Sequence, residues 1–194
     1  MQRIAKGIVR ILVKEQIIER EEQEVYIYGF LLLLTSGATT LVILSMGILI
    51  HEFVLTLSFL AALIVLRHYA GGFHAQTYLR CFSISCLVYV GMLLVTKVLM
   101  NRIPIGGILI GSLFIGMYLI CVGSLNSEKN PKTPIEMQHR KRMVRSLTLI
   151  YNGLILWITI GKVPFEQLAW VLFYVQGVTA VGMWMMKQTR RKLV

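Results

Sequence analysis

The stretch VYIYGFLLLLTSGATTLVILSMGILI, residues 25–50, decides the fold class, because it runs for 26 residues without Asp, Glu, Lys, Arg or His. About 20 apolar residues are enough for a helix to cross a bilayer. Five further apolar stretches follow: Phe53–Leu66, Phe82–Thr96, Ile105–Leu125, Ser146–Ile160 and Phe165–Met186. The first of these five is short for a span, so it either extends through Tyr69 and Ala70 or is partly re-entrant. We therefore expect an all-α integral membrane protein, with about six membrane segments in one membrane domain over 1–194.

The composition supports this class and excludes several others. The chain is 56% apolar and 15% charged, with a mean hydropathy of +0.70. A soluble core of this size could not bury so many apolar side chains, and a disordered chain would be more polar. All nine acidic residues are Glu. The absence of Asp removes the Ser-His-Asp triad, the aspartyl dyad and any DxD metal motif.

Residues 1–24 are predicted to form an amphipathic helix rather than a signal peptide. They carry five basic and five acidic groups with no continuous apolar run between them. Apolar and basic residues alternate at helical spacing, which suits a helix lying on a surface of anionic lipids. The alternative is a helix packed against its own protein.

The basic residues predict the orientation. If the N-terminus is cytoplasmic and six spans alternate across 25–186, seventeen of the twenty Lys and Arg residues fall on the cytoplasmic side, including those of a basic tail over 187–194. This distribution follows the positive-inside rule. We expect a multi-pass cell-membrane protein with both termini in the cytoplasm. The net charge of +11 then reflects topology and anionic lipid, and it does not indicate a nucleic-acid partner.

The segment RHYAGGFHAQTYLRC, residues 67–81, carries the candidate chemistry. The Gly71-Gly72 pair is expected to break the second apolar helix. His74 precedes Cys81 by seven residues, which is about 10.5 Å along a straight helix. A cysteine nucleophile needs a base or a cationic neighbour within contact distance, so the chain must bend between the two. Cys81 is placed at the N-terminal end of the third apolar helix, where the positive partial charge favours a thiolate.

Other roles for these residues remain open at this point. A single membrane cysteine is commonly a small apolar filler, and that is the interpretation for Cys86 and Cys121. An interfacial histidine is commonly just solvated. His68, His74 and Cys81 would give a metal only three ligands, so we expect no metal and no other cofactor.

The pattern R-x3-GG-x-HA-x5-C over 67–81 resembles the signature of the accessory gene regulator B (AgrB) family. These are integral membrane peptidases of Gram-positive bacteria that process quorum-sensing propeptides. By this resemblance His74 and Cys81 correspond to the catalytic pair, and Arg67, Gly71 and Gly72 to supporting motif positions. One departure is that Cys121–Ser124 stands where a proline is usual in the family.

The resemblance implies a cysteine endopeptidase that cuts the C-terminal tail from a short AgrD-like propeptide. Cys81 would hold the product as an acyl-thioester, which an internal Cys or Ser converts to a thiolactone or lactone ring. Candidates for a third catalytic group are Glu128, Glu136, Gln76, Thr77 or a backbone carbonyl. Oxyanion donors would be backbone N–H groups near Cys81, or Arg67. A basic surface is expected to bind the acidic tail, unless its charge reflects positive-inside topology alone: Lys129, Lys132, Arg140, Lys141 and Arg142.

Two further expectations concern assembly and a competing function. Gly106-Gly107, Gly111 and Gly116 give the fourth span close-packing faces, which serve either self-association or packing within the monomer. The family resemblance favours a homodimer. The alternative function is a small transporter that exports a signal peptide without cleaving it. Against a transporter, the spans hold almost no ionisable residue along a path.

Overall fold

The computed structural model describes residues 2–71, 78–125, 133–161 and 163–191, and within these ranges the secondary structure is helical. Six of the helices are long and apolar enough to cross a membrane. The protein is therefore an all-α, multi-pass membrane protein, as the sequence predicts. The elements in chain order are α1 Gln2–Lys14, η1 Arg20–Glu22, α2 Gln23–Leu49, α3 Phe53–Ala70, α4 Tyr78–Leu94, the π-helical η2 Val95–Leu99, α5 Ile105–Val122, α6 Pro134–Gly161 and α7 Glu166–Arg191.

The short second apolar segment, Phe53–Leu66, lies within a single membrane-length helix. Helix α3 runs without a break through 18 residues and ends at Ala70. Arg67 and His68 lie in its last turn, where positive charge is favourable at a helix C-terminus. The continuous helix supports a span over the re-entrant alternative, because a helix of this length can cross the apolar layer.

Helix α6 begins earlier than its apolar stretch, at Pro134 rather than at Ser146. A capping box explains this start. The backbone N–H of Glu136 donates to Thr133 Oγ1 at 3.3 Å, and the N–H of Thr133 donates to Glu136 Oε2 at 3.2 Å. Pro134 occupies the first helical position, where its missing N–H costs nothing. The basic residues from Arg140 onward therefore lie on a helix.

The helices alternate in direction, so that the bundle has two distinct ends. Backbone and side-chain hydrogen bonds bring the C-termini of α3 and α5 together with the start of α6. We call this the site end, because Cys81 at the start of α4 lies there as well. At the far end, Lys97 Nζ lies 3.0 Å from Glu52 Oε1 and links η2 to the start of α3.

Close contacts hold α2, α3, α4 and α7 together at and near the far end. A Cβ added to Gly47 of α2 would lie 2.4 Å from Thr56 Oγ1 of α3. The Thr56 hydroxyl lies 2.7 Å from the Tyr89 hydroxyl of α4. Tyr174 of α7 donates to the carbonyl oxygen of Val88 at 2.9 Å. Small residues and satisfied hydroxyls thus let these backbones approach closely.

Two glycines of α5, Gly111 and Gly116, pack against neighbouring helices of the monomer. A Cβ on Gly111 would lie 3.0 Å from the Phe173 ring, and one on Gly116 would lie 2.3 Å from Asn152 Nδ2. Asn152 in turn accepts a hydrogen bond from Gln176 Nε2 at 3.3 Å across α6 and α7. At these two positions the small residues serve packing between helices of one monomer. The homodimer stays a prediction.

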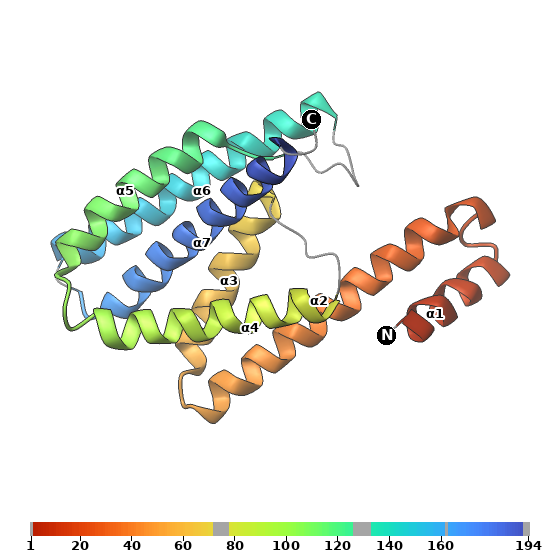
Figure 1. Ribbon diagram of the computed structural model, residues 1–194, viewed down its shortest axis with the longest axis horizontal. Coiled ribbons are helices and arrows are strands. Elements are labelled where there is room, and N and C mark those ends of the chain that lie inside the picture. Colours follow the sequence, from red (N-terminus) through yellow and green to blue (C-terminus); the bar gives the residue numbers. More distant parts are fainter. Residues whose placement is uncertain (1, 72–77, 126–132, 162, 192–194) are drawn as a thin grey trace.

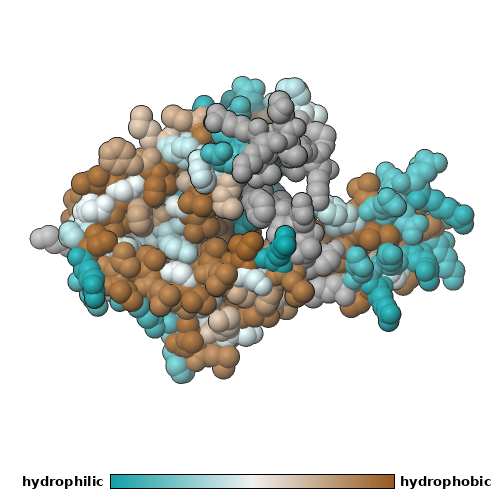
Figure 2. Space-filling model, in the orientation of Figure 1, coloured by the Kyte–Doolittle hydropathy of each residue, from teal (hydrophilic) through white to brown (hydrophobic). Residues whose placement is uncertain are grey.

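The N-terminal helix is shorter than expected. Helix α1 ends at Lys14, and Gln16 has a φ of +56° in the turn that follows. Ala5 and Val9 are fully buried, because α1 packs along α2, while Ile4 and Ile11 are exposed. Figure 1 shows α1 and the N-terminal part of α2 lying apart from the other helices. In Figure 2 this region is largely hydrophilic, whereas apolar residues cover much of the bundle. Helix α1 therefore packs one face against the protein and leaves the other face exposed.

Candidate active site

The second apolar helix stops at Gly71, as its glycine predicts. Gly71 has a φ of +71°, and its N–H donates to the carbonyl oxygen of Arg67 at 3.1 Å. Its missing side chain has a second function. A Cβ there would lie 2.7 Å from the carbonyl oxygen of Leu125. Glycine is therefore required both by the backbone conformation and by the neighbouring chain.

Three hydrogen bonds fasten the end of α3 to the residues that follow α5 and begin α6. The Ser124 hydroxyl donates to the carbonyl oxygen of Tyr69 at 2.7 Å, and the Leu125 N–H donates to that of Ala70 at 3.0 Å. The guanidinium of Arg140 donates to the carbonyl oxygen of His68. These carbonyls lack partners within α3, so each bond satisfies an exposed helix end.

The segment that replaces the family's usual proline takes part in this arrangement. Gly123 ends α5 with a φ of +69°, and its N–H donates to Leu119. The turn directs the next residue, Ser124, to α3. Ser124 is 2% exposed, so its hydrogen bond to Tyr69 is shielded from solvent.

Cys81 lies in the first turn of α4, which confirms its expected position near a helix N-terminus. The first turn of a helix exposes backbone N–H groups and carries a positive partial charge. One turn further, the Ser85 hydroxyl donates to the carbonyl oxygen of Cys81 at 2.9 Å. The Cys81 side chain is half-buried and forms no disulfide.

A cavity of about 240 Å³ extends from Cys81 between α3, α4 and α7. It brings together Cys81 and two of the predicted motif residues, Arg67 and Gly71. Neither Cys86 nor Cys121 contributes to its wall. The described residues that line it are Leu63, Arg67, Gly71, Cys81, Ile84, Ser85, Val88, Val178, Thr179, Val181, Gly182 and Met185.

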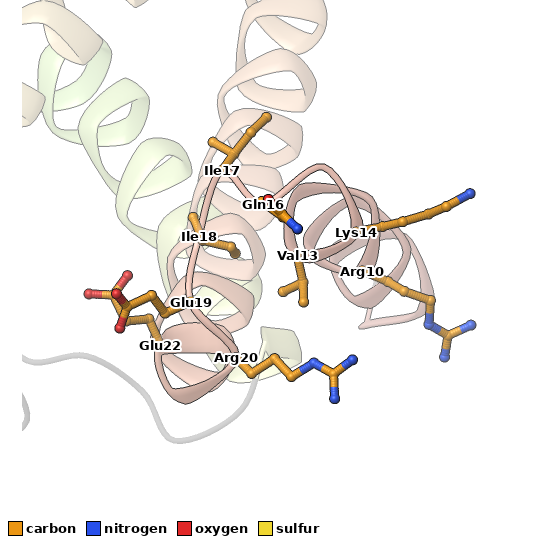
Figure 3. Close-up of a pocket in the computed structure, with 9 residues that line it drawn as sticks. All are labelled: Arg10, Val13, Lys14, Gln16, Ile17, Ile18, Glu19, Arg20 and Glu22. Atoms are coloured by element: carbon orange, nitrogen blue, oxygen red, sulfur yellow. The ribbon is translucent and has the colours of Figure 1, made fainter.

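A second hollow, of about 970 Å³, lies where the chain turns from α1 into α2. Figure 3 shows Arg10 and Arg20 extending on one side of this turn, with Glu19 and Glu22 on the other. The hollow is a charged surface recess whose lining includes neither histidine nor cysteine. We therefore place the candidate chemistry at the smaller cavity beside Cys81.

The remaining predicted residues divide into two groups. His74, Gly72, Lys129, Lys132, Glu128, Gln76 and Thr77 lie outside the described residues, so the bend between His74 and Cys81 and a metal site with His68 stay predictions. The other group lies on α6. Arg140 caps α3, Lys141 packs beside Gly123, and Arg142 is exposed. Glu136 caps the start of α6.

Sequence reasoning missed the contribution of α7. Five residues between Val178 and Met185 line the cavity, and none carries a charge or a metal-binding group. The only signal in the sequence is Gly182, which leaves room beside a helix. A Cβ at Gly182 would meet nothing within 4 Å.

The structure contains six membrane-length helices, and a cysteine in the first turn of one of them lines an apolar cavity. The protein is therefore a multi-pass membrane protein with a candidate thiol site. Comparison with known proteins supplies the family. The profile of the family described as Accessory gene regulator B (AgrB) matches residues 5–186, and the chain belongs to this family. Membership links it to the processing of quorum-sensing peptides of the accessory gene regulator type.

A curated relative agrees with this assignment. The chain is 25% identical to the accessory gene regulator protein B of Staphylococcus carnosus (strain TM300) over 152 residues. The match covers 78% of this chain and 76% of that relative. No solved structure matches the chain significantly.

Proposed function

We propose that the protein is a membrane-embedded cysteine endopeptidase that removes the C-terminal tail of an AgrD-like propeptide and promotes its cyclisation. The observation that carries the proposal is the shared cavity of Cys81, Arg67 and Gly71. These three motif residues come from two helices and meet at one end of an apolar pocket. Pockets with apolar walls and a few convergent polar groups are typical of ligand sites.

The first chemical step is attack of the Cys81 thiolate on the backbone carbonyl between signal and tail. The new C–S bond forms as the peptide C–N bond breaks, and His74 delivers the proton that the departing amine requires. The tail leaves with a free amino terminus. The N-terminal part of the propeptide stays on Cys81 as a thioester.

The second step closes the ring. A thiol or hydroxyl within the bound peptide attacks the thioester carbon, and the C–S bond to Cys81 breaks. The proton from the attacking group returns to the Cys81 sulfur through His74, so the enzyme is regenerated. When the attacking group is a thiol, one thioester replaces another with little change in energy. Ring closure competes with hydrolysis, so the site must exclude water from the acyl-enzyme. An apolar cavity between membrane helices is suited to this task.

The propeptide tail is proposed to bind on the basic surface that starts in segment 126–132 and continues onto α6. Lys129, Lys132, Lys141 and Arg142 supply charge for an acidic tail. Arg140 belongs to the same surface, but its guanidinium also caps α3. The site end is proposed to face the cytoplasm together with both termini, since the basic residues concentrate there.

The test is co-expression of the chain with the propeptide encoded beside its gene, comparing the variants Cys81→Ala, His74→Ala and Cys86→Ala. We expect the first two to abolish release of the tail. Cys86 is the matched control, because it lies on the same helix outside the cavity lining. Mass spectrometry of the wild type is expected to find a peptidyl thioester on Cys81.

Three outcomes would contradict the proposal. If Cys81→Ala still releases the tail, the protein is not the cysteine peptidase. Loss of export together with unaltered cleavage would favour the transporter alternative. If Cys86→Ala abolishes cleavage while the protein accumulates normally in the membrane, the nucleophile has been assigned to the wrong thiol.

A further inference from the structure

The cavity beside Cys81 has walls that offer apolar contacts along most of its length. On α7 the Thr179 hydroxyl donates to the carbonyl oxygen of Val175 at 2.8 Å. On α4 the Ser85 hydroxyl likewise donates to the carbonyl oxygen of Cys81. Both hydroxyl protons are therefore committed to their own helices. Leu63, Val88, Val178 and Gly182 supply apolar wall between them.

The depth and volume of the cavity fit one amino-acid side chain. The α4 residues that line it run from Cys81 to Val88, about 10.5 Å along a helix axis. Cavities of about 150 Å³ already hold a benzene molecule. The 240 Å³ here accommodates an aromatic or branched aliphatic side chain. At the bottom, Tyr174 is hydrogen-bonded to the carbonyl oxygen of Val88, which holds α7 against α4.

We infer that this cavity is the specificity pocket for the substrate residue whose carbonyl carbon Cys81 attacks, and that it selects a large apolar side chain such as Leu, Met or Phe. The inference rests on the proposed function, because it requires Cys81 to hold the acyl group. The side chain of that residue branches one atom from the thioester carbon, so it is the substrate side chain nearest to Cys81. Filling the cavity with it also keeps water from the thioester.

Membrane lipid is the competing occupant. The α7 and α4 edges of the cavity are open, with Val181 57% and Ile84 41% exposed. An acyl chain could enter through this side. The peptide side chain is favoured because the same cavity contains Cys81 together with Arg67 and Gly71, three residues of the motif that the lipid would not require.

The experiment measures covalent labelling of Cys81 in the full chain in proteoliposomes. The probes are acetyl-dipeptide acyloxymethyl ketones that differ only in the residue beside the ketone, which is Ala, Leu, Phe or Glu. Labelling is followed by mass spectrometry of the Cys81 peptide. Iodoacetamide, which has no side chain to place, reports the reactivity of the thiol itself. We expect the Leu and Phe probes to react at least about ten-fold faster than Glu or Ala, the factor for moving such a side chain from water into an apolar site.

Gly182→Leu is the decisive variant, because Gly182 lines the cavity on α7 and a Cβ there meets nothing within 4 Å. It is expected to bring the Leu-to-Ala and Phe-to-Ala rate ratios close to one. Gly153→Leu is the matched control. Gly153 lies on the exposed side of α6, where a Cβ also meets nothing within 4 Å. This control should keep the wild-type ratios. If Gly182→Leu fails to accumulate, Val88→Ala enlarges the pocket instead and should raise the Phe-to-Leu ratio.

The outcomes separate the two proposals. Equal labelling by all four probes, with ratios unchanged in Gly182→Leu or in Val88→Ala, would overturn the specificity pocket and assign the cavity to lipid. Cys81 would in that case remain a reactive thiol. If neither iodoacetamide nor any probe labels Cys81 in the wild type, the proposed nucleophile is wrong and the pocket inference is overturned with it.

Discussion

The Ser124 hydroxyl lies 2.7 Å from the carbonyl oxygen of Tyr69, although the two residues are 55 positions apart in the chain. This bond joins the end of α5 to the end of α3, two residues before Gly71. It therefore ties the residues that precede segment 126–132, which contains Lys129 and Lys132, to the helix that carries Arg67. The end of the helix that leads into the proposed catalytic segment is thus held by a residue outside the motif.

Replacing this hydroxyl tests its contribution. Ser124→Ala is expected to lower the rate of tail release about five-fold, because one shielded hydrogen bond contributes about 1 kcal/mol. Ser112→Ala is the control, since Ser112 is also buried but donates to Leu109 within its own helix at 2.8 Å. Cleavage of the propeptide is measured at equal amounts of membrane-inserted protein. Equal losses in both variants would contradict a positioning role for Ser124.

A conservative replacement of Arg140 tests whether this residue acts by capping α3 or only through its positive charge. Its guanidinium donates to the carbonyl oxygen of His68, and its Nε lies 3.5 Å from Ser124 Oγ. Lysine keeps the charge but cannot reproduce this planar arrangement. Arg140→Lys should therefore lower cleavage about ten-fold, as expected for losing a charged hydrogen bond. Arg142→Lys, an exposed site on the same helix, should have little effect. Near-normal cleavage by Arg140→Lys would show that only the charge matters.

Gly71→Ala combines two unfavourable changes. The residue has a φ of +71°, and the new Cβ would lie 2.7 Å from the Leu125 carbonyl oxygen. Strain of this kind costs roughly 1–3 kcal/mol, so we expect a loss of cleavage between about five-fold and about a hundred-fold. Gly106→Ala, where a Cβ meets nothing within 4 Å, is the control. The assay is tail release together with thermal stability of the solubilised protein, and wild-type behaviour of Gly71→Ala would contradict the steric argument.

Near the far end, a buried hydrogen bond should outweigh the exposed ion pair. Glu52→Gln breaks the contact with Lys97, whose side chain is 57% exposed, and an exposed pair is worth less than about 1 kcal/mol. Tyr89→Phe removes a buried hydrogen bond between α3 and α4, which costs about 0.5–1.5 kcal/mol because the Thr56 hydroxyl keeps its bond to the carbonyl oxygen of Glu52. Thermal unfolding of the solubilised protein should show the larger decrease for Tyr89→Phe. The reverse order would indicate that the ion pair is the stronger link.

The buried contact at Gly116 predicts a loss of stability in the centre of the bundle. A methyl group there would lie 2.3 Å from Asn152 Nδ2 and 3.1 Å from Thr148 Cγ2. Overpacking of this kind costs about 1–3 kcal/mol. Gly116→Ala should accumulate poorly in membranes, whereas Gly177→Ala, with its nearest atom at 3.9 Å, should accumulate normally. Normal accumulation of both would mean that Asn152 moves aside at little cost.

The membrane spans could be predicted from apolar runs, but hydropathy alone does not place their ends, and at α3 Gly71 supplies the signal instead. Arg67 ends an apolar run, yet α3 continues to Ala70, because helical hydrogen bonding extends beyond the apolar layer. The same reason places the start of α6 at Pro134. There the sequence does contain a local signal, the Thr133 and Glu136 capping box, which hydropathy does not detect.

The site was predictable only where its residues are adjacent in the chain. The motif over 67–81 contains Cys81, Arg67 and Gly71, and the structure places these three around one cavity. The α7 wall depends on how three helices pack, and nothing in the sequence around Gly182 indicates it. Charge patterning also could not separate Arg140, which caps α3, from its neighbour Arg142. Both are basic residues on one helix, and only the fold gives them different partners.

The contacts near the far end have a mechanical consequence for the bundle. Gly47 against Thr56, Thr56 with Tyr89, and Tyr174 with Val88 leave α3, α4 and α7 little freedom to separate there. At the other end, Gly71 and Cys81 line the cavity together with Arg67. The contacts near the far end therefore fix the part of the cavity near Val88, while Cys81 lies seven residues away at the start of α4. Admission of a linear peptide and release of a wider ring would both take place at the site end.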